Sequence, residues 1–80
     1  MWFKSRPSPS MNIGYGAMFR RLRAPEIVET AHIIEVSPDS AGIMHVRFNL
    51  QISGPRYSEE DQRTLALESF RSLYRDAVAV

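Results

Sequence analysis

The feature that most constrains the fold is a strict alternation of apolar and polar side chains over residues 43–52. Successive side chains of a β-strand point to opposite faces of the sheet, so an alternation of period two indicates one buried and one solvated face. This segment is therefore predicted to be a half-buried antiparallel strand. The apolar set is Met44, Val46, Phe48, Leu50 and Ile52, and the opposite set is Ile43, His45, Arg47, Asn49 and Gln51.

A second strand is predicted over residues 27–36, which are rich in β-branched side chains. Between the two strands, Pro38, Asp39 and Gly42 supply the side chains and backbone freedom that tight turns require. The two strands are therefore expected to form an antiparallel hairpin.

The polarity of the strands favours one register for this hairpin. Pairing Ile34 with Met44 places Glu29 and Glu35 on the polar face, whereas a slip by one residue would move both carboxylates into the core. On this register the two glutamates share their face with His45 and Arg47.

Residues 59–77 are predicted to form one amphipathic helix. Ser58 is a natural N-cap, and the acidic residues that follow suit the positive end of the helix dipole. An apolar stripe then follows helical spacing. A competing interpretation makes Arg63–Leu67 a third strand and begins the helix near Ser69. The stripe consists of Ala66, Phe70, Leu73, Tyr74 and Ala77, with Leu67 and Val78 at its margin.

Together these elements predict a small single-domain α+β fold. The hairpin of about residues 27–36 and 43–52 is covered on its apolar face by the helix of about 59–77, because a two-stranded sheet is marginal by itself in water. The domain occupies residues 26–80, and residues 1–25 form a basic, partly flexible N-terminal arm. One edge of the second strand lacks a partner in this arrangement, which makes a homodimer through that edge a reasonable hypothesis.

Composition limits the classes of function. The chain has 80 residues and no cysteine, so disulfides, thiolate chemistry and cysteine-type zinc sites are excluded. No stretch approaches the roughly 20 apolar residues that cross a bilayer. A reducing cytoplasm is the expected location, although the arm, rich in arginine and serine and free of acids, also fits an organelle transit peptide.

The charges are divided unevenly along the chain. Residues 1–25 hold five basic side chains and no acid, whereas residues 26–80 hold five arginines and nine acids, a formal −4. The prolines at positions 7 and 9 predict an extended, mobile tail, and a short helix is expected near residues 16–23.

The basic arm is the candidate contact for a polyanion or a partner. A protein partner or a second copy of the chain is the favoured partner, nucleic acid is second, and a membrane is the least favoured; the arm could also simply pack on the open sheet. The candidate contact residues are Lys4, Arg6, Tyr15, Phe19, Arg20, Arg21 and Arg23.

No motif for catalysis, phosphate binding or metal binding is present in the sequence, and no cofactor is expected. The predicted register sends His32 and His45 to opposite faces, so they would not share a metal ion. A cluster of Glu29, Glu35, His45 and Arg47 could in principle perform acid–base work, but a solvated face is the commoner outcome. The sequence therefore predicts a small non-enzymatic protein-interaction or self-association module. The alternative is a nucleic-acid-binding protein that uses the aromatic and basic arm.

Overall fold

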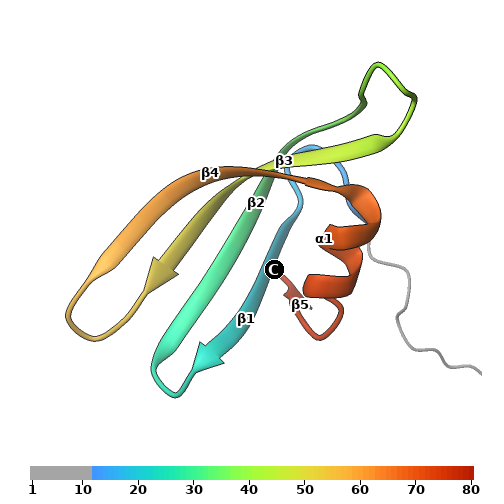
Figure 1. Ribbon diagram of the computed structural model, residues 1–80. Coiled ribbons are helices and arrows are strands. Elements are labelled where there is room, and N and C mark those ends of the chain that lie inside the picture. Colours follow the sequence, from blue (N-terminus) through green and yellow to red (C-terminus); the bar gives the residue numbers. More distant parts are fainter. Residues whose placement is uncertain (1–11) are drawn as a thin grey trace, which may run out of the picture.

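The structure, a computed structural model, describes residues 12–80. It is a five-stranded antiparallel sheet in the order β4-β3-β2-β1-β5, with one short helix, α1, against one face (Figure 1). Because strands that follow one another in sequence lie side by side through β1 to β4, short turns suffice to connect them. The elements are β1 (Met18–Ala24), β2 (Ile27–Pro38), β3 (Met44–Ser53), β4 (Ser58–Ala66), α1 (Leu67–Leu73) and β5 (Val78–Ala79).

The predicted α+β class is wrong, because the chain is mostly antiparallel sheet: residues 59–66 of the predicted helix are strand, and only residues 67–73 are helix. Residues Ser58–Ala66 pair with β3 along its whole length, from Ser53 opposite Ser58 to His45 opposite Ala66. The N–H and C=O groups on the side of β3 away from β2 need hydrogen-bond partners, and pairing with residues 58–66 provides them. This tertiary requirement outweighs the local preference of residues 58–61 for a helix start. The competing interpretation, a third strand at Arg63–Leu67 followed by a helix from near Ser69, is closer to the structure. The strand includes residues 63–66, and the helix begins at Leu67.

The short helix predicted near residues 16–23 is also wrong. These residues belong to β1, which pairs with β2 from Met18 opposite His32 to Ala24 opposite Ile27. Gly16 lies just before the strand with a φ of +86°, which directs the chain out of a tight turn and into the sheet. Residues 18–24 of the predicted arm are thus part of the sheet, while residues 1–11 lie outside the described residues.

The hairpin of β2 and β3 is present, but its predicted register is wrong. Val36 lies opposite Val46, and the register shifts between Ile33 and Glu35, where β2 carries one extra residue. Such a bulge reverses which side chains face inward along the rest of the strand. Consequently Glu29 lies opposite Ile52 on the inner face, only 3% exposed, instead of on the polar face.

The turn between β2 and β3 is closed by Asp39. Its Oδ1 accepts hydrogen bonds from the backbone N–H of Ala41 at 2.8 Å and of Ile43 at 3.0 Å. The bond from Ile43, with further help from Ala41 and His45, lowers the pKa of the Asp39 carboxyl below its usual 3.8. An aspartate that bonds its own following backbone is the turn chemistry expected from this segment.

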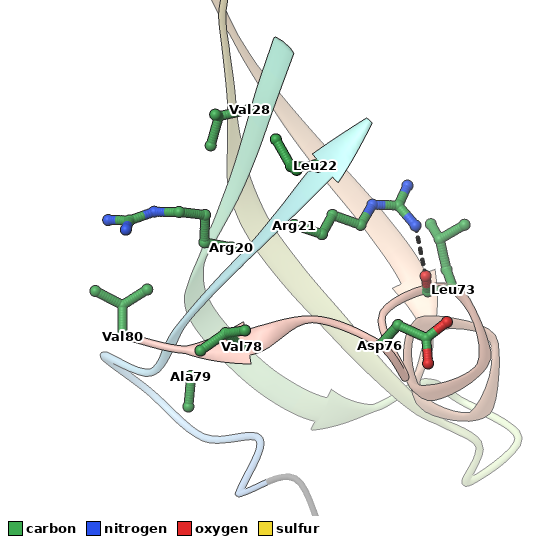
Figure 2. A pocket seen from close by; sticks show the side chains of 9 residues that line it. All are labelled: Arg20, Arg21, Leu22, Val28, Leu73, Asp76, Val78, Ala79 and Val80. Carbon is green, nitrogen blue, oxygen red and sulfur yellow. Dashed lines mark hydrogen bonds between the residues drawn. The ribbon is translucent and has the colours of Figure 1, made fainter. Parts of the chain in front are cut away.

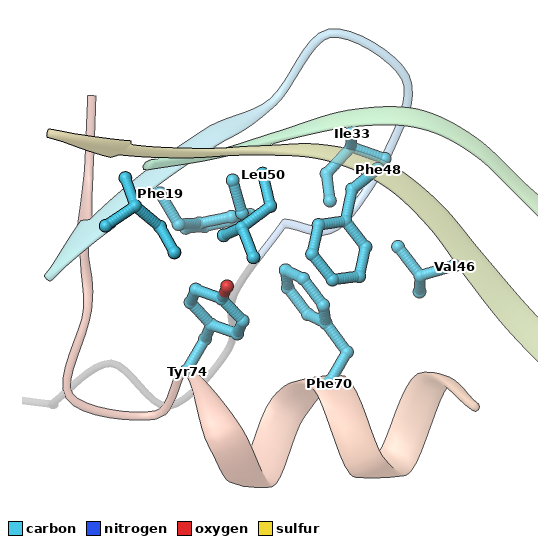
Figure 3. Packing of buried hydrophobic residues seen from close by; sticks show 9 residues of the cluster. Phe19, Ile33, Val46, Phe48, Leu50, Phe70 and Tyr74 are labelled. Atoms are coloured by element: carbon cyan, nitrogen blue, oxygen red, sulfur yellow. The ribbon is translucent and has the colours of Figure 1, made fainter. Parts of the chain in front are cut away.

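The core lies between the inner face of the sheet and α1 (Figure 3). Phe70 stacks on Tyr74 with ring centroids 4.5 Å apart and meets Phe48 edge to face at 5.1 Å. The helix has seven residues and no side-chain cap, so this packing, and not intrinsic propensity, accounts for its presence. The buried apolar residues are Phe19, Ala31, Ile33, Val46, Phe48, Leu50, Ile52, Phe70 and Tyr74.

Candidate interaction site at the edge of β1 and β5

The three clustered arginines of the sequence are separated by the strand in which they lie. Side chains alternate along β1, so Arg20 lies on the outer face while Arg21 and Arg23 lie on the inner face with Phe19. A helix would have kept them near one another at its end. The arginines therefore do not form one basic patch: Arg20 lies on one face of the sheet, and Arg21 and Arg23 lie on the other.

Arg21 is held by the protein itself. Its Nη1 donates to the backbone oxygen of Leu73 at 2.6 Å, its Nη2 donates to Oε1 of Glu29 at 3.3 Å, and its guanidinium lies 4.7 Å from the centre of the Tyr74 ring. Arg23 lies farther from the same carboxylate, with Nη1 3.9 Å from Oε1. Arg21 thus joins β1 to the end of α1 and is mainly a structural cation.

Tyr74 completes this buried network. Its hydroxyl donates to Oε2 of Glu29. Burial raises the pKa of the Tyr74 phenol well above its ordinary value of 10, and the hydrogen bond to Glu29 raises it further. Among residues 12–80, Nε of Arg21 is the one buried side-chain nitrogen or oxygen atom without a hydrogen-bond partner. The network therefore uses most of the polar groups that the inner face buries.

A pocket of about 800 Å³ lies where β5 meets β1 (Figure 2). Three of its apolar side chains are strongly exposed, at 71% for Leu22, 68% for Val78 and 62% for Val80. Arg20 extends from β1 between Val28 and Val80, and Asp76 lies on the side of α1 (Figure 2). The residues that line the pocket are Arg20, Arg21, Leu22, Val28, Leu73, Asp76, Val78, Ala79 and Val80.

The backbone of β1 is open at this pocket. β5 pairs with β1 only at Phe19 and Arg20, and the N–H of Val80 donates to the oxygen of Met18. Residues of an antiparallel strand direct their N–H and C=O groups alternately to its two sides. Leu22 lies two residues beyond Arg20, so its N–H and C=O groups point to the edge of β1 that β5 occupies. β5 does not extend as far as Leu22, and these groups are therefore open.

The structure brings only part of the predicted contact set to this pocket. Arg20 and Arg21 line it, whereas Phe19 is buried in the core and Tyr15 is 86% exposed in the loop before β1. Lys4 and Arg6 lie outside the described residues. Sequence reasoning missed the apolar half of the site; the run of small apolar residues at 77–80 was the available signal for β5.

The outer face carries both histidines. His32 lies opposite Asn49 and His45 opposite Ser37, so the predicted projection to opposite faces is wrong because the register differs. His45 places Nδ1 2.9 Å from the oxygen of Ile43, beside the turn. Within residues 12–80, no group of three histidine, cysteine or acidic side chains has metal-binding geometry.

The predicted acid–base cluster is divided by the bulge in β2. Glu35 and Arg47 form an exposed ion pair at 2.8 Å on the outer face, while Glu29 lies on the inner face. The four side chains of the predicted cluster therefore do not share one site.

No family model, curated protein or solved structure matches this chain. In the part of the chain from residue 12 onward, no helix is long and apolar enough to cross a membrane. The geometry of the β1–β5 edge is accordingly the basis for a functional hypothesis.

Proposed function

We propose that this protein is a non-enzymatic protein-interaction module that binds an extended segment of a partner at the edge of β1 and β5. The observation that carries the proposal is the combination of open strand backbone and exposed apolar side chains at one place. β5 pairs with β1 at Phe19 and Arg20 and does not reach Leu22, whose uncovered backbone adjoins a pocket of about 800 Å³. Strand addition at an open sheet edge is a recurrent mode of peptide recognition.

The side chains around the edge define the chemistry of the partner segment. An added strand would present alternate side chains to the outer face, where Leu22, Val28 and Val80 offer apolar contact. Arg20 lies on the same face and favours a carboxylate two residues along the segment. The preferred ligand is therefore an extended peptide in which an apolar and an acidic residue stand two positions apart and face outward together.

This chemistry can be tested with a defined probe. An acetylated peptide with the repeat Val-Thr-Glu-Thr, which places valine and glutamate on one face of a strand, is titrated into the ¹⁵N-labelled chain. The charge control is the same peptide with lysine in place of glutamate. Saturable shifts of the Leu22, Val78 and Val80 amides are expected for the first peptide and weaker ones for the second, because Arg20 attracts carboxylates and repels ammonium groups. Shifts absent from these amides at saturating peptide would contradict the proposal.

A pair of variants distinguishes specific binding at the β1–β5 edge from non-specific hydrophobic binding. Leu22→Asp removes an exposed apolar side chain from the pocket, whereas Ile43→Asp removes one from the turn between β2 and β3, where 55% of the residue is exposed. We expect Leu22→Asp to weaken peptide binding at least about tenfold and Ile43→Asp to leave it within about twofold. Equal losses for both variants would assign the binding to non-specific hydrophobic contact.

The nucleic-acid alternative has its own outcome. Phe19 is buried and unavailable for base stacking, so binding of a fluorescent single-stranded oligonucleotide would depend on exposed cations such as Arg20. Oligonucleotide binding that falls steeply with salt and is lost in Arg20→Glu would replace the protein-partner proposal.

A further inference from the structure

The opposite edge of the sheet is formed by β4, which has a neighbour on one side only. It pairs with β3 without a register shift, and residues 58–64 are all exposed. The strand contains no proline. A long, regular edge of this kind is a template for another strand unless something blocks it.

The direction of the free backbone groups follows from the turn between β3 and β4. The N–H of Gly54 donates to the oxygen of Tyr57, so the odd-numbered residues of β4 direct their N–H and C=O groups toward β3. Glu60, Gln62 and Thr64 therefore direct theirs to the open edge. In agreement with this, the N–H of Gln62 donates to the carboxylate of its neighbour Asp61 at 2.9 Å, and not to another strand.

We propose that β4 pairs antiparallel with β4 of a second copy of this chain, about a two-fold axis at Gln62. In this register the backbone of Gln62 bonds its own counterpart, and Glu60 lies opposite Thr64 of the second copy. Asp61 then lies opposite Arg63 of the second copy, twice in the dimer. The two sheets become one continuous sheet with both α1 helices on the same face.

Charge selects this register over its neighbours. A shift of one residue would misalign the free N–H and C=O groups, so the alternatives differ by two. Those alternatives place Asp61 opposite Asp61, or Arg63 opposite Arg63, and like charges directly opposite one another destabilise a sheet. Only the Gln62-centred register pairs opposite charges on both sides of the axis.

In the single chain, the side chains that would pair across the dimer, Asp61 and Arg63, bond to each other at the open edge of β4. Asp61 bonds Nε of Arg63 through Oδ2 at 2.9 Å and the Gln62 N–H through Oδ1. Pairing of two chains replaces the second bond by a backbone bond of Gln62 and lets each Asp61 reach two arginines. This surface lies at the opposite edge of the sheet from the β1–β5 pocket, so its test is independent of the proposed function.

Charge reversal tests the register. Sedimentation equilibrium of the full chain from low to high micromolar concentration should show a monomer–dimer equilibrium. Asp61→Arg and Arg63→Asp should each raise the dimer dissociation constant at least about tenfold, because the axis doubles each repulsion, and the double variant should return to within about threefold of the original. A monomer at every concentration, or no recovery in the double variant, would overturn the proposal.

A backbone variant tests the hydrogen bonding. Gln62→Pro should keep the fold, measured by circular dichroism, because the N–H it removes faces the open edge, but it should abolish the dimer. The control is Glu35→Ala on β2, which breaks an exposed ion pair with β3 lying between it and β4 and should leave the dissociation constant unchanged. A folded Gln62→Pro chain that still dimerises would contradict strand pairing at this edge.

Discussion

The inner face of the sheet has two halves with different chemistry. Under α1, aromatic rings pack tightly, and Phe70 is fully buried. Beyond the helix, the same face carries two sets of paired charges, Glu29 with Arg21 and Arg23, and Asp61 with Arg63. The second pair borders a small cavity of about 170 Å³ that Leu50 and Ile52 also line. The difference shows that a seven-residue helix can cover only part of the sheet, and that paired charges cover what remains.

Tyr74 lies at the boundary between the two halves. Its ring stacks on Phe70, and its hydroxyl donates to Glu29. If the two halves differ as their contacts indicate, truncation under the helix should cost the most, changes in the charged half should depend on burial, and changes at the uncovered end of the sheet should cost the least.

The largest effect is expected for Phe70→Ala. Removing this ring leaves a cavity between α1 and β3 and should reduce the free energy of unfolding by about 3–5 kcal/mol, which is a large part of the stability of so small a domain. Leu73→Ala, in the same helix but 47% exposed, should cost less than about 1 kcal/mol. Urea unfolding followed by circular dichroism measures both, and equal losses would show that α1 is not anchored by its inner face.

The next effect compares two glutamates that each pair with an arginine. Glu29→Ala leaves the Tyr74 hydroxyl and Arg21 without their buried acceptor and should cost about 2–3 kcal/mol. Glu35→Ala breaks the exposed pair with Arg47 and should cost under about 1 kcal/mol. A similar cost for both variants in urea unfolding would mean that the burial of Glu29 contributes nothing.

A smaller effect should appear at alkaline pH. The pKa of Tyr74 is higher in the folded chain than in the unfolded one, so its contribution to stability is complete below pH 10 and is lost as the pH rises toward the folded value. Stability should therefore fall above about pH 10 in the parent chain and fall less steeply in Tyr74→Phe. Tyr57→Phe, with an exposed ring, is the control and should keep the parent slope.

The smallest effect is a gain at the uncovered end of the sheet. Glu26, in the turn between β1 and β2, has a φ of +85°, a conformation that strains side chains other than glycine. Glu26→Gly should relieve this strain and stabilise the fold by about 0.5–1 kcal/mol, after allowing for the greater freedom of glycine when unfolded. Destabilisation in the same unfolding assay would show that the turn is held by contacts of the Glu26 side chain.

Alternation made β3 predictable, because a period of two has one simple explanation in a sheet, and the β-branched side chains of residues 27–36 made β2 predictable. β4 was not predictable from the same kind of pattern. Its residues 58–61 combine a capping serine with three acids, which locally favours a helix start, and almost all its side chains are exposed, so no buried face revealed the strand. The helix beyond it was recognised through Phe70 and Tyr74, but with a start several residues too early.

Of the residues that line the β1–β5 pocket, only the arginines could be predicted from the sequence. The arginines of β1 stand out in the sequence, yet which face each occupies depends on strand instead of helix geometry. The apolar side chains that complete the pocket come from positions about 50 residues away, and β5 is only two residues long. Pairing over such a separation is not encoded in any local pattern.

The sequence by itself determined the strands β2 and β3, the turn chemistry at Asp39 and the aromatic residues that anchor α1, because each depends on neighbours within a few positions. The tertiary structure alone decided the bulge in β2 that buries Glu29, the conversion of residues 58–66 into an edge strand, and the meeting of β5 with β1. The physical reason is that open strand edges and inner-face charges must find partners, and those partners are defined only when distant parts of the chain come together.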